Sequence, residues 1–211
     1  MEITWDDLIM NKFRENVDED SVFCDVGACD GIYTTFFKSM SGSMVYSFEL
    51  NPTNFEKIKH LSSDKCICEN LAISDKSEVV NIYSDDIGSG NHISNIIGHD
   101  TSFRPMDIIG TIESISLDEY FKDIKVDFMK IDVEGAELKV IKGGIKTISN
   151  CKFVIIECHY DEDWEEIYQI LSENNLNFKN LVNDEQVFFN TTTKIPGRSE
   201  IGRPYQMYLN Q

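Results

Sequence analysis

The chain has 211 residues, of which 41% are apolar, and its 37 acidic and 19 basic side chains give a formal net charge of −18. This length and composition predict one globular domain and exclude an intrinsically disordered protein. The acidic balance disfavours non-specific binding to nucleic acid or to an anionic membrane, because both depend on clustered Lys and Arg.

Six cysteines lie scattered through the chain, and no two of them form a C-x-x-C pair. They give no support to a zinc site, and we interpret them as reduced thiols in a cytoplasmic protein. The segment Met1–Asp7 lacks the pattern of a signal peptide, and no apolar run approaches the roughly 20 residues that cross a bilayer. We therefore expect no membrane insertion.

The first half of the chain alternates strand-like and helix-like segments. Apolar residues at helical spacing predict an amphipathic helix within residues 1–20. The segments that follow are a strand at 22–26, a helix at 32–40, a strand at 44–48, a helix that begins at 52 and a strand at 66–68. This alternation predicts a parallel sheet with helices on both faces.

The second half returns to buried strands after an irregular stretch. Residues 79–83 suggest a strand in an antiparallel excursion, and residues 85–110, rich in Gly, Ser, Asn and Asp, are predicted as a long loop. The later segments are a helix at 117–121, strands at 126–131 and 153–156, helical stripes at 138–148 and 164–171, and final strands near 178–182 and 187–189. No internal repeat or domain linker is visible in the sequence.

A glycine-containing loop, Asp25-Val-Gly-Ala-Cys-Asp-Gly31, follows the first buried strand. In open parallel sheets, ligands bind at the carboxyl ends of the strands. The loop lacks the middle glycine of a dinucleotide fingerprint and the Gly-Lys-Ser/Thr of a Walker loop. S-adenosylmethionine has no phosphate and carries positive charge, so it suits a loop that contains a carboxylate. The alternative is a tight turn between strand and helix with no ligand.

An acid at the end of the second strand strengthens the case for a nucleoside ligand. Glu49 stands where an acidic side chain accepts hydrogen bonds from ribose hydroxyls. Together with the loop, it predicts an adenosine-type site. The alternative is an exposed surface acid.

A more specific pattern occurs at Lys130-Ile-Asp-Val-Glu-Gly-Ala-Glu137, which resembles the FkbM family of methyltransferases. Further stretches that fit this family in order are 23–28, 48–52, 70–75, 116–120 and 154–157. The resemblance implies a class I, Rossmann-like α/β fold: a three-layer sandwich whose seven-stranded, mostly parallel sheet has an antiparallel C-terminal strand. It also implies one methyltransferase domain over residues 1–211 and methyl transfer from S-adenosylmethionine to a hydroxyl of a sugar, glycan or other small molecule.

The resemblance assigns cofactor contacts to residues at three strand ends. Asp25, Gly27, Ala28 and Gly31 would lie at the methionine end, Glu49 at the ribose, and Leu50, Asn70 and Ala72 at the adenine. Residues 85–110 and 191–211 carry none of the family's motifs. The first of these segments is expected to be a variable loop on the substrate side.

Candidate catalytic groups follow the fourth and fifth core strands. An alcohol is a weak nucleophile at neutral pH, so a general base is expected. The candidates are Asp132, Glu134, Glu157 and His159. Asp132 is the first choice for lying near the transferred methyl group or the cofactor's amine. The leading interpretation includes no metal site.

Three alternatives for these candidate residues stay open. Glu134 could cap a helix that begins at Gly135. His159 could be structural. A set of Asp132, Glu157 and His159 could hold Mg²⁺.

Two other functions compete with an O-methyltransferase of small molecules or glycans. The chain could be a non-catalytic scaffold or sensor that binds S-adenosylmethionine, although both the loop motif and the Lys130–Glu137 motif are present. It could also be an RNA ribose methyltransferase, which the net charge of −18 disfavours. We therefore expect a small-molecule or glycan acceptor and no nucleic acid.

Overall fold

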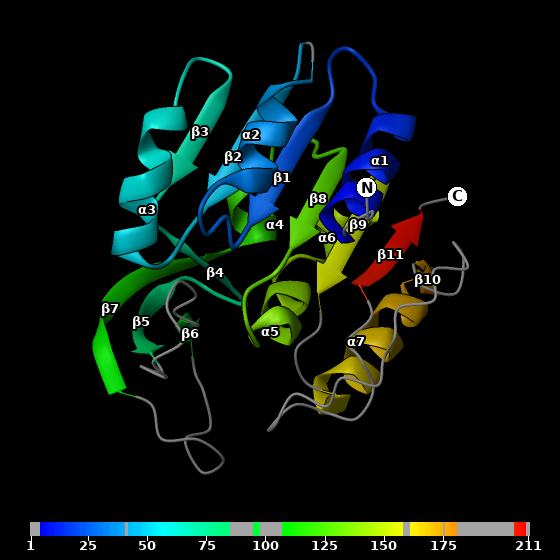
Figure 1. Ribbon diagram of the computed structural model, residues 1–211. Coiled ribbons are helices and arrows are strands. Elements are labelled where there is room, and N and C mark those ends of the chain that lie inside the picture. Colours follow the sequence, from blue (N-terminus) through cyan, green and yellow to red (C-terminus); the bar gives the residue numbers. More distant parts are fainter. Residues whose placement is uncertain are drawn as a thin grey trace.

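The protein is represented by a computed structural model that describes residues 5–40, 42–84, 95–97, 107–157, 161–174, 176–180 and 205–209. Its main sheet has seven strands in the order β10-β11-β9-β8-β1-β2-β3 (Figure 1). In chain order they are β1 Val22–Val26, β2 Met44–Phe48, β3 Cys66–Glu69, β8 Phe128–Ile131, β9 Phe153–Glu157, β10 Asn177–Asn180 and β11 Tyr205–Leu209.

Parallel pairing is confined to five strands of this sheet. The strands β3, β2, β1, β8 and β9 pair in parallel. By contrast, β11 pairs antiparallel with both β9 and β10. The α/β class and an antiparallel strand near the C-terminus are confirmed, and parallel pairing is limited to five of the seven strands. The expected last strand at 187–189 lies outside the described residues, and the strand that pairs with β9 is β11, much nearer the end of the chain.

Alternating side chains on the strands create the two faces of the sheet. Phe23, Phe128 and Phe153 point into a cluster with α1 (Trp5–Asn16) and α2 (Ile32–Lys38). Their neighbours Cys24, Met129 and Val154 point into a second cluster. Because side chains alternate along a strand with a period of two, each strand is buried on both faces.

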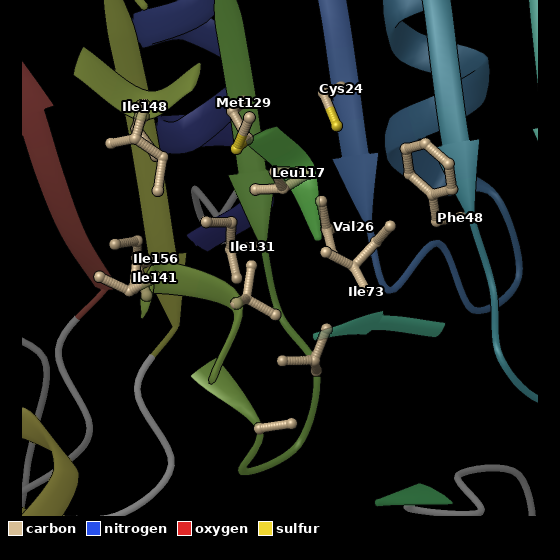
Figure 2. Packing of buried hydrophobic residues seen from close by; sticks show 14 of the residues in the cluster. Cys24, Val26, Phe48, Ile73, Leu117, Met129, Ile131, Ile141, Ile148 and Ile156 are labelled. Atoms are coloured by element: carbon tan, nitrogen blue, oxygen red, sulfur yellow. The ribbon is translucent and has the colours of Figure 1, made fainter. Parts of the chain in front are cut away.

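The second cluster lies under four short or medium helices. These are α4 Leu117–Tyr120, α5 Glu137–Lys142, α6 Ile145–Ser149 and α7 Asp161–Glu173. Figure 2 shows Met129 and Ile131 of β8 beside Leu117, with Ile141 and Ile156 nearby. The predicted helix at 117–121 is confirmed, and Ser116 caps it by accepting a hydrogen bond from the Glu119 amide. The helix α3 (Pro52–Ile58) and the turn η1 (Lys59–Leu61) pack beside β3.

The predicted N-terminal helix is confirmed as α1. Ile9 and Phe13, four residues apart and therefore on one face, are fully buried. The Phe13 ring meets Phe37 and Phe153 edge-on, with centroid distances of 4.9 and 5.1 Å. No helix among the described residues is both long enough and apolar enough to cross a membrane.

A second, four-stranded sheet has the order β4-β7-β5-β6. Its strands are β4 Ala72–Ser74, β5 Glu78–Ser84, β6 Asn95–Ile97 and β7 Asp107–Ser116. The antiparallel excursion at 79–83 is confirmed as β5, which pairs with β7. Figure 1 shows this sheet near the edge at which β1, β2 and β8 end.

The predicted loop at 85–110 was partly wrong, because residues 95–97 and 107–110 form strands. Ile108 and Ile109 are both exposed, so this part of β7 has no alternation of buried and exposed side chains that sequence reading could detect. Residues 85–94 and 98–106 lie outside the described residues.

Candidate active site

A cavity of about 270 Å³ opens where β1, β2 and β8 end. This is the edge at which parallel sheets bind ligands. The residues predicted for the site that line this cavity are Gly27, Ala28, Glu49, Leu50, Ala72, Asp132 and Glu134. The loop after β1, the end of β2 and the loop after β8 therefore converge on one space.

The glycines of the first loop are required by the chain itself. Gly27 has a φ of 83°, and a Cβ there would lie 1.8 Å from the backbone oxygen of Asp132. Gly31 has a φ of 82°, and a Cβ there would lie 2.8 Å from Cγ2 of Ile58. The amides of Gly27 and Ala28 both donate to the carbonyl of Phe48, each at 3.0 Å. The loop is thus fitted tightly against its neighbours, and Gly31 is not among the residues that line the cavity.

Asp25 lies behind the loop and is completely buried. Its Oδ2 accepts a hydrogen bond of 2.7 Å from the hydroxyl of Thr34, and its Oδ1 lies 3.8 Å from Nζ of Lys130. Burial raises the pKa of Asp25, while the Lys130 ammonium opposes that effect. The observed partners of Asp25 are the side chains of Thr34 and Lys130. Asp25 does not line the cavity, so its direct contact with a cofactor stays a prediction.

Glu49 ties the first loop to the end of β2. Its Oε2 accepts from the Cys29 amide and its Oε1 from the Asn51 amide, both at 2.7 Å. Only 6% of Glu49 is exposed, and burial raises its pKa. A carboxylate oxygen can accept more than one hydrogen bond, so Glu49 can still accept hydrogen bonds from ribose hydroxyls at the cavity wall.

The side of the cavity expected to hold adenine is largely apolar. Leu50 and Ala72 line it together with Phe48, Leu71 and Ile73. Asn70 does not line it.

The Asn70 amide donates instead to two backbone carbonyls, those of Glu49 at 2.8 Å and Leu50 at 3.1 Å. Asn70 therefore fixes the turn after β2, and its predicted adenine contact stays a prediction.

The second loop, Asp132–Glu137, follows β8. Glu134 has a φ of 57° and Gly135 a φ of 114°. The fully buried Glu137 holds this turn, because its Oε1 accepts from the amides of Val133 at 3.3 Å and Gly135 at 3.0 Å. The alternative in which Glu134 caps a helix beginning at Gly135 is wrong, because α5 begins at Glu137 and has no side-chain cap. The carboxylate of Glu137 itself accepts from the loop amides. Glu134 instead lines the cavity.

Backbone strain concentrates at the cavity. Two non-glycine residues of the described chain have a positive φ, Cys29 at 51° and Glu134 at 57°, and both line the cavity. The left-handed region costs an ordinary residue about 1–2 kcal/mol. Strain of this kind clusters at functional sites, because the surrounding structure must enforce it.

Lys130 is a cavity residue for which the sequence suggested no role. It is only 5% exposed, and its Nζ lies 3.1 Å from the Gly27 carbonyl and 3.3 Å from Oδ2 of Asp132. Burial alone would lower the pKa of Lys130. The surrounding carboxylates nevertheless raise it above its ordinary value; they belong to Asp132, Asp25 and Glu157. The available signal was a lysine inside the apolar strand Phe-Met-Lys-Ile.

The remaining candidates lie at or beyond the end of β9. Glu157 is half-buried at the end of that strand and does not line the cavity, and His159 lies outside the described residues. The described part of the chain contains no group of three His, Cys, Asp or Glu that could hold a metal ion. The alternative with Mg²⁺ involves His159 and therefore stays an untested alternative.

The chemistry of the wall indicates the kind of ligand that fits. Carboxylates at Glu49, Asp132 and Glu134 suit hydroxyl donors and a cationic group, while the apolar wall from Leu50 to Ile73 suits a flat ring. A nucleoside that carries a positive charge combines these features, and S-adenosylmethionine is such a molecule.

Comparisons with known proteins agree with this chemistry. The family model described as the methyltransferase FkbM domain matches residues 25–179. The hexuronic acid methyltransferase AglP of Haloferax volcanii is 30% identical over 170 residues, which are 78% of this chain and 67% of that protein.

Solved structures with the same fold were also found. An rRNA methylase from Streptococcus thermophilus matches with a TM-score of 0.54 and 12% identity, over 99% of this chain and 98% of its own. A Streptococcus mutans protein described as a methyltransferase, in complex with SAH, has a TM-score of 0.54 and 10% identity, with 99% of each chain covered. At such low identities these structures show the fold alone.

Proposed function

The chain belongs to the FkbM methyltransferase family, and from this premise we propose that it methylates a hydroxyl group of a sugar, glycan or other small molecule. It is an S-adenosylmethionine-dependent methyltransferase. The observation that carries the proposal is the convergence of Glu49 and Asp132, from two distant motifs, on one cavity.

The cofactor's place in the cavity follows from the character of each wall. Glu49 would accept hydrogen bonds from the ribose hydroxyls, with Leu50 and Ala72 beside the adenine. Gly27, Ala28 and Asp132 would surround the methionine end, and Asp25 would support the loop from behind. When bound, S-adenosylmethionine supplies an electrophilic methyl group on a sulfonium.

The acceptor hydroxyl must lose a proton as it attacks, and a carboxylate on the cavity wall would receive it. Asp132 is paired with Lys130, which suits a fixed anion facing the cationic end of the cofactor. Glu134 lines the same cavity on a strained turn, so we assign it the role of the general base that accepts the proton of the acceptor hydroxyl. Glu157 and His159 remain further candidates for contact with the acceptor.

A sugar acceptor is supported by the relative from Haloferax volcanii, which is named as a hexuronic acid methyltransferase. We propose that residues 1–211 work as one catalytic domain and that residues 85–110 select the acceptor. We place the reaction in the cytoplasm, where the free thiols of the five described cysteines would stay reduced.

The test combines binding with a transfer screen. Calorimetry should detect micromolar binding of SAH, and methyl-labelled cofactor should label a hydroxyl in a panel of neutral sugars, uronic acids, polyketides and RNA. Absence of SAH binding would refute the cofactor site. Tight binding with no labelled acceptor would favour a sensor, and labelling of RNA ribose alone would favour an RNA methyltransferase.

A further inference from the structure

Lys130 connects two adjacent loops that both line the cavity. Its Nζ donates to the Gly27 carbonyl in the loop after β1, at 3.1 Å. The same atom lies 3.3 Å from Oδ2 of Asp132, in the loop after β8. One side chain of β8 thus reaches both loops from below.

The Lys130 ammonium is surrounded by oxygen atoms. The Gly27 carbonyl and the Asp132 carboxylate lie within hydrogen-bond distance of Nζ, and the Asp25 carboxylate of β1 adds an ion pair at 3.8 Å. The Tyr33 ring lies beneath the charge, 5.0 Å from its centroid. A group enclosed in this way has few other positions to adopt.

We propose that Lys130 is a positioning residue, which holds the Asp132 carboxylate and the Gly27 carbonyl in the places on the cavity wall that cofactor binding requires. This inference rests on the proposed function of the cavity. It assigns a role in binding to a lysine that would otherwise be read as a counter-charge for a buried acid.

The competing explanation is that Lys130 serves only the fold. Asp25 is fully buried, and a buried carboxylate that loses its cationic partner is strongly destabilising. A single change at Lys130 would therefore mix the two effects, because Asp25 would be left without its ammonium.

A paired substitution separates them. Lys130→Met keeps a side chain of similar length without charge, and Asp25→Asn in the same chain removes the buried anion. The pair deletes one positive and one negative charge, so the local net charge of Asp25, Lys130 and Asp132 stays at −1. Any loss of binding in a folded double variant beyond the loss in D25N alone then reflects the position of Asp132 and Gly27 and not the total charge.

The experiment compares the wild type, D25N, K130M, D25N/K130M and the matched surface control K122M. Folding is followed by thermal unfolding, SAH affinity by calorimetry, and kcat and KM for the cofactor separately. We expect K130M to unfold at a lower temperature and D25N/K130M to recover much of that loss. The double variant should nevertheless bind SAH about tenfold more weakly, with a raised KM, while K122M matches the wild type.

Two results would overturn the inference. One is wild-type SAH affinity and KM in a folded D25N/K130M protein; the other is a double variant that does not fold, which would make Lys130 a requirement of the fold alone. If the wild type and K122M themselves bind no SAH, the proposed function fails instead, and the two failures are therefore distinguishable.

Discussion

The two loops that form the cavity are shaped by different forces. The loop after β1 is set by steric fit, since Gly27 lies where any Cβ would meet the Asp132 backbone oxygen at 1.8 Å. The loop after β8 is set by polar contacts, since the Glu137 carboxylate accepts from two of its amides. Each loop nevertheless carries one strained non-glycine residue, Cys29 or Glu134.

A similar backbone strain can thus be enforced in two ways, by steric fit or by hydrogen bonds, and the two differ in how well they tolerate a substitution. Steric fit fails abruptly, because a methyl group cannot be placed 1.8 Å from a backbone oxygen without moving the chain. Polar fixation fails gradually, because a lost acceptor leaves amides that water or a substitute can partly satisfy. Substitutions in the two loops would test this contrast.

Gly27→Ala should produce the largest loss. The new Cβ would collide with the backbone of Asp132 in a left-handed conformation, and we expect the free energy of unfolding to fall by more than about 4 kcal/mol. Chemical denaturation measures this loss. Gly110→Ala is the matched control, because nothing lies within 4 Å of a Cβ at Gly110. A loss below about 1 kcal/mol at Gly27 would remove steric fit as the basis of this loop.

Glu137→Ala should have an intermediate effect. Two loop amides would lose their acceptor, and we expect a loss of about 2–4 kcal/mol in the free energy of unfolding. Glu137→Gln keeps a carbonyl oxygen and should lose clearly less. Glu165→Ala, on the exposed face of α7, serves as the control. Equal losses for Ala and Gln would show that the hydrogen bonds to Val133 and Gly135 do not hold the turn.

Glu49→Gln should cost less stability than Glu137→Ala but should also weaken binding. Its carboxylate faces two amides, and an NH₂ group cannot accept from either. We expect a loss of about 1–2 kcal/mol in stability and about tenfold in SAH affinity, which corresponds to about 1.4 kcal/mol. Denaturation and calorimetry on one preparation separate the two. Unchanged SAH affinity would reject Glu49 as the ribose partner while leaving its role in the loop intact.

Cys29→Gly should have the smallest effect, and in the opposite direction. Glycine removes the cost of a positive φ but adds flexibility to the unfolded chain, so we expect a gain of up to about 1 kcal/mol. Cys29→Ala keeps the strain and should show no gain. If the Cys29→Gly variant is no more stable than Cys29→Ala, the positive φ at this position does not measurably lower the free energy of unfolding.

Local signals allowed much of the fold to be predicted. The buried runs at β1, β2, β8 and β9 are short and apolar, and their alternation with helices in the sequence predicts the α/β class. Asp132 and Glu49 were found because the ends of parallel strands meet at one edge. Local signals could not predict which segments pair when they lie far apart in the sequence. The pairing of β11 with β9 joins Tyr205 to Glu157, and Tyr205 lies in the segment 191–211 that carries none of the family's motifs.

The same limit applies to the surroundings of the site residues. Asp25 belongs to the loop motif, but only the three-dimensional structure shows that Thr34 and Lys130 surround it behind the cavity wall. Glu134 and Glu137 are both acids near a helix start, and sequence alone cannot tell which carboxylate turns back onto the loop amides. The sequence suggested no role for Lys130 because two of its partners, Gly27 and Asp25, lie 103 and 105 positions earlier in the chain.

The long strand β7 has two parts that differ in burial. In its second half Ile112, Ser114 and Ser116 are buried, whereas in its first half Ile108 and Ile109 are exposed and the strand is held mainly by pairing with β5. Beyond the pair formed by the buried Ile82 and Gly110, an insertion or deletion of a matched pair of residues would change the length of the β5–β7 ribbon without displacing a buried side chain. The ribbon is therefore the natural place to graft new sequence onto this protein, and its outer end can diverge while the core and the cofactor cavity stay as they are.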